Sequence, residues 1–258
     1  MSDSNSTHSN ALWLNLPSLN LSVKSLFTGY LLAIGLGAIL ATAQILFTHG
    51  MADGELGLSV DDIVYSYHGD PTQSKIETKL NGSMRDKASS VDKLKIIKWV
   101  RAGAPEELWH SDIKTVFYTN CISCHSTIPG IPNFMEYEDV KLVAKIDDGA
   151  STTSLTKVSH IHMFAISFIF FINGLIFSLS INIKQWIKVS VISLPFLFLI
   201  IDVFSWWLTK LAPEFAWLTI ISGMGYSLCS IVTWFVSMYQ MWILPLKHKK
   251  IEINSWTE

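Results

Sequence analysis

The chain contains four apolar runs, and they limit how it can fold more than any other feature of the sequence. They cover residues 26–47, 158–181, 189–208 and 215–244. Each run is long enough to cross the hydrocarbon core of a bilayer as a helix. A helix satisfies its backbone hydrogen bonds internally, as a lipid environment requires. We therefore expect four membrane-spanning helices, with a kink at Pro195 in the third and a tilt in the long fourth.

Charged residues are concentrated between the first and second apolar runs. Residues 48–157 carry most of the chain's 21 acidic and 19 basic side chains, which is typical of a soluble domain set among membrane spans. The formal net charge is only −2, and no basic patch indicates nucleic-acid binding. We divide the chain into a tail at 1–24, a membrane helix at 25–47, a soluble domain at 48–157, a three-helix membrane region at 158–245 and a tail at 246–258.

The first apolar run has two features with alternative interpretations. Ala41-Thr42-Ala43 resembles a signal-peptidase site. However, the preceding tail is long and weakly basic and reads as flexible, and the apolar run continues beyond the site. These features favour a retained anchor over a cleaved signal peptide. Small residues recur at Gly29, Ala33, Gly37 and Ala41; they either let another helix approach closely or are ordinary helix-forming residues.

Basic residues predict the orientation of the four spans. Lys184 and Lys188 lie in the loop between the second and third spans, and three lysines follow the fourth. With four spans, these residues and Lys24 fall on one side, whereas the opposite short loop carries only Lys210. Because basic loops remain preferentially in the cytoplasm, both termini are expected there. In a bacterial inner membrane, residues 48–157 would then face the periplasm.

The cysteines supply the clearest chemical signal. Two of the three occur in Cys121-Ile122-Ser123-Cys124-His125, which has the CxxCH spacing of covalent haem c attachment. Each thiol can form a thioether with a haem vinyl group, and the histidine can bind the iron. A zinc site would need further Cys or His ligands, and Cys229 lies in an apolar run where it cannot serve. The sequence therefore predicts one covalent haem, attached outside the cytoplasm.

The soluble segment resembles c-type cytochromes, with its parts in an unusual order. Residues 112–118 have helical spacing and lead into Cys121, like the first helix of a cytochrome c domain. Upstream, His68-Gly69-Asp70-Pro71-Thr72-Gln73-Ser74-Lys75-Ile76 resembles the G-D-P-x-x-S-x-L motif of planctomycete-type cytochrome domains. Asn81-Gly82-Ser83-Met84 and a helix at 91–101 resemble their methionine loop and closing helix. The resemblance covers residues 68–140 and implies a circularly permuted cytochrome c domain. The alternative is that residues 68–106 are the remnant of a lost domain without haem contact.

The order of these parts decides which side chain binds the iron opposite His125. The resemblance implies Met84, and thioether ligation raises the reduction potential. Met135, close to the motif, is a second candidate. His160 and His162 begin the second span and are a third. Their use would place the haem at the membrane surface and lower its potential.

One carboxylate lies inside an apolar run. Asp202 is about two helical turns from the outer end of the third span, and intramembrane carboxylates are by default functional candidates. It either makes a structural hydrogen bond, pairs with Lys210 or a histidine, or belongs to a quinol site. In a quinol site, Asp202, His160 and His162 would accept protons. The nearby Trp206, Trp207 and Trp217 are expected to be ordinary residues of the membrane interface.

These observations predict an all-α protein with four transmembrane helices and an inserted cytochrome c-like haem domain. Its expected function is to relay single electrons between a membrane respiratory partner and a periplasmic redox partner. It would be an electron-transfer protein rather than a stand-alone catalyst. Four spans exceed what anchoring needs, so a larger complex or a second copy is expected to pack on them within the lipid bilayer. The alternatives are a quinol-oxidising subunit of a membrane oxidoreductase, with quinone as a partner, and a haem-based redox or gas sensor.

Overall fold

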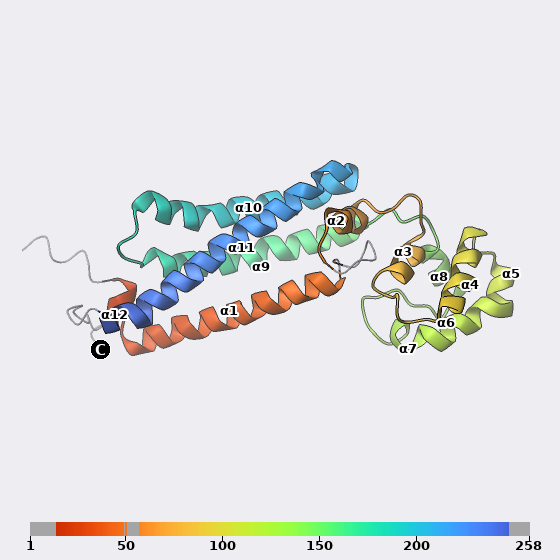
Figure 1. The fold of residues 1–258 in the computed structure, drawn as a ribbon, viewed down its shortest axis with the longest axis horizontal. Helices are drawn as coiled ribbons and strands as arrows, with labels where there is room; N and C mark the ends of the chain where they lie inside the picture. The colour runs from red at the N-terminus through yellow and green to blue at the C-terminus, as the bar shows by residue number, and fades with distance from the viewer. Residues whose placement is uncertain (1–13, 49, 51–56, 248–258) are drawn as a thin grey trace, which may run out of the picture. The chain divides into compact units, whose positions relative to one another are not determined.

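The computed structural model describes residues 14–48, 50 and 57–247, and this part of the chain is helical without a strand (Figure 1). Four segments of it are long and apolar enough to cross a membrane: Leu21–Phe47, Thr152–Ser178, Gln185–Leu211 and Pro213–Lys247. The four expected spans are therefore confirmed, and the chain is a multi-pass membrane protein.

The long helices extend beyond the runs that hydropathy delimits. They are α1 (Leu21–Thr48), α9 (Thr152–Ser178), α10 (Gln185–Leu211) and α11 (Ala216–Met238), the last followed by a π-helical turn η4 (Tyr239–Ile243) and by α12 (Leu244–Lys247). The second helix begins at Thr152 rather than at 158, because polar residues at a helix end can lie outside the hydrocarbon. α10 continues through Pro195.

Two compact units make up the chain, and each is described by itself. The first, which we call the bundle, comprises Met1–Ala41, Val158–Phe204 and Leu218–Glu258. The second, which we call the helical domain, comprises Thr42–Lys157 and Ser205–Trp217. The helical domain therefore includes the last turns of α10 and the short helix η3 (Pro213–Phe215).

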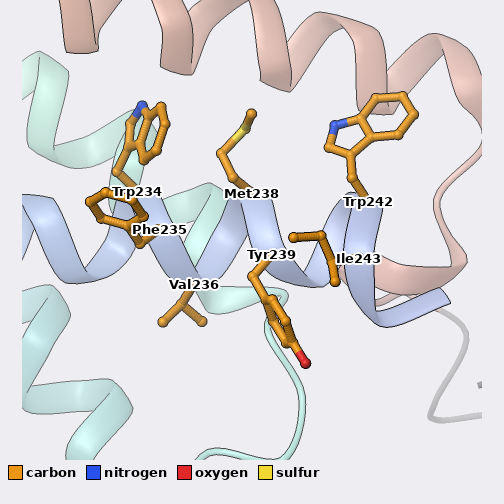
Figure 2. A pocket seen from close by; sticks show the side chains of 7 residues that line it. All are labelled: Trp234, Phe235, Val236, Met238, Tyr239, Trp242 and Ile243. Atoms are coloured by element: carbon orange, nitrogen blue, oxygen red, sulfur yellow. The ribbon is translucent and has the colours of Figure 1, made fainter. Parts of the chain in front are cut away.

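Within the bundle, α11 and η4 pack on α1 through tryptophans. Figure 2 shows Trp234, Met238 and Trp242 pointing toward α1, whereas Val236 and Tyr239 point away from it. Trp234 Nε1 donates to the Leu31 carbonyl at 2.8 Å, and Trp242 Nε1 donates to Thr28 Oγ1 at 2.8 Å. A Cβ added at Gly29 or Gly37 would meet nothing within 4 Å. The face of α1 that carries the small residues is therefore open at both of these glycines.

The segment before α1 departs from the expected flexible tail. Residues Leu16–Ser18 form the 3₁₀ turn η1, and the backbone N–H of Leu16 donates to the Leu179 carbonyl at 3.0 Å. Leu16 and Leu19 are buried, because these leucines supply apolar surface that packs on the bundle. The part of the tail at 1–13 and the residues from 248 onward lie outside the described residues.

Short helices build the helical domain. They are α2 (Val60–Tyr67), α3 (Lys75–Asn81), α4 (Ser90–Arg101), α5 (Glu106–Leu108), a π-helical turn η2 (Trp109–Ile113), α6 (Lys114–Asn120), α7 (Ile122–His125) and α8 (Tyr137–Val143). Ser59, Ser74 and Ser89 cap the first turns of α2, α3 and α4, because each serine oxygen accepts the backbone N–H three residues later. The serine of the G-D-P-x-x-S motif is therefore a helix cap.

One hydrophobic core joins the two halves of the helical domain. Trp99 of α4 lies 5.9 Å from Trp109 and 6.3 Å from Phe117 between ring centroids. The Tyr137 hydroxyl of α8 donates to the Ala104 carbonyl at 2.9 Å. The segment upstream of the CxxCH motif therefore shares one hydrophobic core with the motif.

The last turns of α10 pack on α2 inside the helical domain. Trp206 is buried and stacks on Tyr67, with ring centroids 5.8 Å apart and an interplanar angle of 8°. His68 Nδ1 lies 3.1 Å from the Lys210 carbonyl oxygen, and Lys210 Nζ donates to the Asp148 carbonyl at 2.9 Å. Trp206 was expected to be an ordinary residue of the membrane interface, and this expectation was wrong, because α2 covers its ring. Trp217, by contrast, is exposed.

Candidate haem site

The CxxCH residues form one helical turn at the end of α6. The Cys121 N–H donates to the Phe117 carbonyl at 2.8 Å, and the His125 N–H donates to the Cys121 carbonyl at 3.0 Å. Residues three apart are neighbours on a helix surface. The turn therefore presents the two sulfurs near one another, with the imidazole one residue further on.

The two thiols occupy different environments. Cys121 is half-buried against the core of the helical domain, and burial raises the pKa of its thiol to about 11. Cys124 is exposed, and neither cysteine forms a disulfide. Both sulfurs therefore remain available for covalent attachment, one beside the apolar core and one toward the outside.

The imidazole of His125 is held in one orientation by two contacts. Its Nδ1 lies 2.8 Å from the Pro132 carbonyl oxygen, and because a carbonyl only accepts, Nδ1 is the donor. The Phe134 ring lies parallel to it, with centroids 4.0 Å apart and an interplanar angle of 8°. Phe134 is itself buried against Phe117 at 5.4 Å.

This hydrogen bond fixes the tautomer of His125. With the proton on Nδ1, Nε2 carries a free lone pair, and among the described residues no hydrogen-bond partner is seen for Nε2. Metal-binding histidines usually donate their second ring N–H to a carbonyl or carboxylate. Sequence reasoning missed Pro132 and Phe134 as functional residues, because only the loop's path back to the imidazole reveals their roles.

The methionine candidates both lie in loops of the helical domain. Met84 follows α3, its N–H donates to the Lys79 carbonyl at 2.8 Å, and its side chain is 36% exposed. Met135 follows Phe134 and is exposed, and its carbonyl accepts from the Tyr118 hydroxyl at 3.2 Å. An exposed thioether is free to turn toward a ligand, so both side chains remain candidates.

His160 and His162 lie near the start of α9 in the bundle. His160 is exposed, and its ring meets that of Phe164 edge-on at 5.2 Å. His162 Nδ1 lies 3.0 Å from the Val158 carbonyl oxygen, one turn earlier in the same helix. As ligands they remain an alternative to the methionines.

Asp202 is buried among hydroxyl groups of the bundle. It is 4% exposed, its Oδ1 lies 3.5 Å from Ser222 Oγ, and the Tyr226 side chain also hydrogen-bonds to it. Both partners are on α11. The arrangement fits a structural hydrogen-bond role, and it also provides the carboxylate that proton chemistry requires.

A second kind of metal centre has no donor set in the described part of the chain. Among residues 14–48, 50 and 57–247 there is no group of three or more His, Cys, Asp or Glu side chains that could hold a metal ion. The CxxCH turn therefore lacks the additional ligands that a structural zinc site needs.

Comparison with known proteins supports the membrane part of the chain. Residues 133–250 match a family described as a transmembrane helical domain. The match begins in the loop after the CxxCH turn and includes α9, α10 and α11. No curated protein and no solved structure matches the chain. The comparisons thus agree with the four spans in placing this chain among multi-pass membrane proteins.

Proposed function

We propose that the helical domain is a covalent haem c domain and that the protein relays single electrons at a membrane. The observation that carries this proposal is the oriented His125. A CxxCH turn whose histidine donates Nδ1–H to the Pro132 carbonyl presents Nε2 as an iron ligand. The buried Phe134 ring stacked on this imidazole supports the same orientation.

The residues of the turn fit the chemistry of haem attachment. The Cys121 and Cys124 sulfurs would each bond to one carbon of a vinyl group, and the thiol hydrogen would pass to the other carbon. His125 and Met84 would hold the iron. Bound in this way, haem iron supplies one-electron redox chemistry. The protein's own part is to orient the imidazole through the Pro132 carbonyl and the Phe134 ring.

The membrane spans indicate where the relay works. We propose that the protein lies in a bacterial inner membrane, with both termini in the cytoplasm and the haem domain in the periplasm. Four spans and the open glycine face of α1 favour packing in a larger membrane complex or with a second copy. Its partners would be a respiratory protein in the membrane and a redox protein in the periplasm.

Covalent haem on the purified chain tests this proposal. The protein should be produced with a haem c maturation system, denatured, and examined for haem that stays with the polypeptide. We expect one haem per chain, and the double variant Cys121→Ser/Cys124→Ser should lose it. Cys229→Ser is the matched control, because it removes the third cysteine without touching the turn. An unmodified chain, or equal haem content in all variants, would refute the proposal.

The axial ligand opposite His125 is tested separately. If Met84 binds the iron, Met84→Ala should remove the methionine-to-iron charge-transfer band of the oxidised haem and lower its potential. Met135→Ala is the matched control from the other loop. Loss of the band in Met135→Ala alone would assign Met135, and a spectrum that changes only in His160→Ala or His162→Ala would assign a histidine.

Quinol oxidation at Asp202 is the second candidate function, and the buried carboxylate with its Ser222 and Tyr226 partners favours it. Here Asp202→Asn combined with His162→Ala should abolish haem reduction by a quinol analogue while haem content stays normal. Unchanged reduction would exclude this function.

A haem that binds carbon monoxide readily would instead favour a sensor, because a six-coordinate relay leaves no position for the gas.

A further inference from the structure

Polar side chains follow one face of α11 and η4 through the bundle. They are Ser222, Tyr226, Ser230, Thr233, Ser237 and Gln240, and we call them the polar seam. Successive members are three or four residues apart, so they share one face of the helix. Ser222, Thr233, Ser237 and Gln240 are buried, whereas apolar residues such as Leu228 and Phe235 are exposed. Polar groups inside a membrane are costly and often line ion or proton pathways.

The polar seam connects a carboxylate to the opposite end of the bundle. At one end, Asp202 meets Ser222 and Tyr226. At the other end, Gln240 Nε2 donates to the Ile181 carbonyl at 2.9 Å, and its Oε1 accepts from the Ile181 N–H at 2.8 Å. Ile181 lies in the loop between α9 and α10, so this end of the seam reaches the edge of the bundle.

A small cavity interrupts the middle of the polar seam. It has a volume of about 10 Å³, enough for one water molecule, and Ser230, Thr233, Asn173, Val191 and Pro195 are among its lining residues. Asn173 is buried, and its Oδ1 has no hydrogen-bond partner among the described residues. Pro195 has no N–H to donate to the carbonyl of Val191, four residues earlier. The Asn173 oxygen therefore lacks a donor that a water molecule would supply, and the Val191 carbonyl lacks its usual helical donor.

Other buried hydroxyls near the polar seam also lack hydrogen-bond partners within the described residues. Ser237 Oγ and Ser180 Oγ are buried without a partner in the described part of the chain. The Ser230 and Thr233 hydroxyls donate to backbone carbonyls at 2.8 and 2.9 Å, which leaves their lone pairs available to accept. Side chains one turn apart have Cβ atoms about 5–6 Å apart, a gap that one water can bridge.

We propose that the polar seam is a water-assisted proton path between Asp202 and the Gln240 end of the bundle. Each hydroxyl or water on the path accepts a proton from one neighbour and donates another to the next. The Asp202 carboxylate becomes a carboxylic acid when a proton arrives and is restored when it leaves. One positive charge moves, and no electron is transferred.

Proton flux through the full-length protein in liposomes tests this path. A pH-sensitive dye is trapped inside, and a potassium gradient with valinomycin imposes a voltage. Wild-type protein should admit protons faster than protein-free liposomes do. Ser237→Ala should slow this flux several-fold, and Asp202→Asn should reduce it to the protein-free rate. Ser227→Ala is the matched control, because Ser227 is an exposed serine on the same helix, and it should leave the flux unchanged.

Two further variants separate proton transfer from packing. Thr233→Val keeps the shape of the side chain and removes the hydroxyl, whereas Thr233→Ser keeps the hydroxyl and removes a methyl group. The path predicts slow flux only in the valine variant, and a packing role predicts the larger effect in the serine variant. Wild-type flux equal to that of protein-free liposomes, or equal flux in Ser237→Ala and Ser227→Ala, would overturn the proposal. Because the path uses no residue of the haem site, Cys121→Ser/Cys124→Ser should conduct normally.

Discussion

At the scale of single residues, the CxxCH turn distinguishes two thiols that look equivalent in the sequence. Cys121 sits against the buried core around Phe117, and Cys124 is exposed. Burial disfavours the thiolate, so the pKa of Cys121 rises from 9.0 to about 11. Because thiolates are the nucleophilic form, the two cysteines should differ in reactivity.

Alkylation of the haem-free protein measures this difference. In a Cys229→Ser background, Cys124→Ser leaves only Cys121, and Cys121→Ser leaves only Cys124. Well below pH 9.0, the thiolate fraction of Cys121 should be about 100-fold smaller than that of a thiol with the ordinary pKa of 9.0. Its alkylation rate should therefore be the slower one and should keep rising with pH up to about 11. Equal rates in the two single-cysteine proteins would contradict the burial of Cys121.

At the scale of elements, an ion pair between Glu77 and Arg101 links α3 to α4. Arg101 Nε lies 2.7 Å from Glu77 Oε1, and Glu77 is buried. Burial alone raises the pKa of Glu77, but hydrogen bonds from Ser74 and Arg101 outweigh it, so the pKa is lowered overall. The lowered pKa means that the folded domain favours the charged carboxylate.

Removing Arg101 should therefore weaken the domain in a pH-dependent way. A carboxylate with a depressed folded pKa contributes stability above its unfolded pKa, 4.5 here, and loses that contribution as pH falls through the folded pKa. Because the guanidinium is 69% exposed, Arg101→Gln should cost only about 1–2 kcal/mol at neutral pH and less in acid. Urea unfolding at several pH values measures this. Arg85→Gln removes an ion pair with Asp86, a carboxylate that is 85% exposed, and should cost below about 0.5 kcal/mol. Equal losses in the two variants would exclude a special role for Arg101.

A second contact between elements lies where Gly149 packs against the backbone of Tyr67 and Gly69. Gly149 has φ +69°, and a Cβ there would lie 2.3 Å from the Tyr67 carbonyl oxygen. Gly149→Ala should destabilise the domain by at least about 2 kcal/mol, because both the backbone angle and the contact are violated. Gly37→Ala, where a Cβ meets nothing within 4 Å, should not lower stability. Thermal unfolding of both variants tests the difference.

At the scale of the whole molecule, the four spans and the lysine distribution together predict topology. In spheroplasts, an external protease should digest residues 48–157 and spare a tag at the C-terminus. The tag should become sensitive only after the membrane is opened. Protection of residues 48–157 together with an accessible tag would invert the orientation. It would also place the proposed haem site outside the compartment where haem c is attached.

The sequence by itself determined the features that depend on local chemistry. Hydropathy placed the four spans, because lipid imposes one length and one apolar composition on every crossing helix. Apolar spacing predicted a helix leading into Cys121, and the resemblance implied the helix that ends at Arg101. The resemblance to cytochrome domains stays a prediction; the structure shows that the segments before and after the CxxCH motif share a core around Trp99 and Phe117.

Only the tertiary structure decided features that need distant segments to meet. The Pro132 carbonyl orients His125 because the loop folds back, and Trp206 is buried because α2 covers it. Asn173 and Pro195 share a cavity with α11 only in the packed bundle. No local pattern encodes these contacts, because each depends on the packing of side chains far apart in the chain.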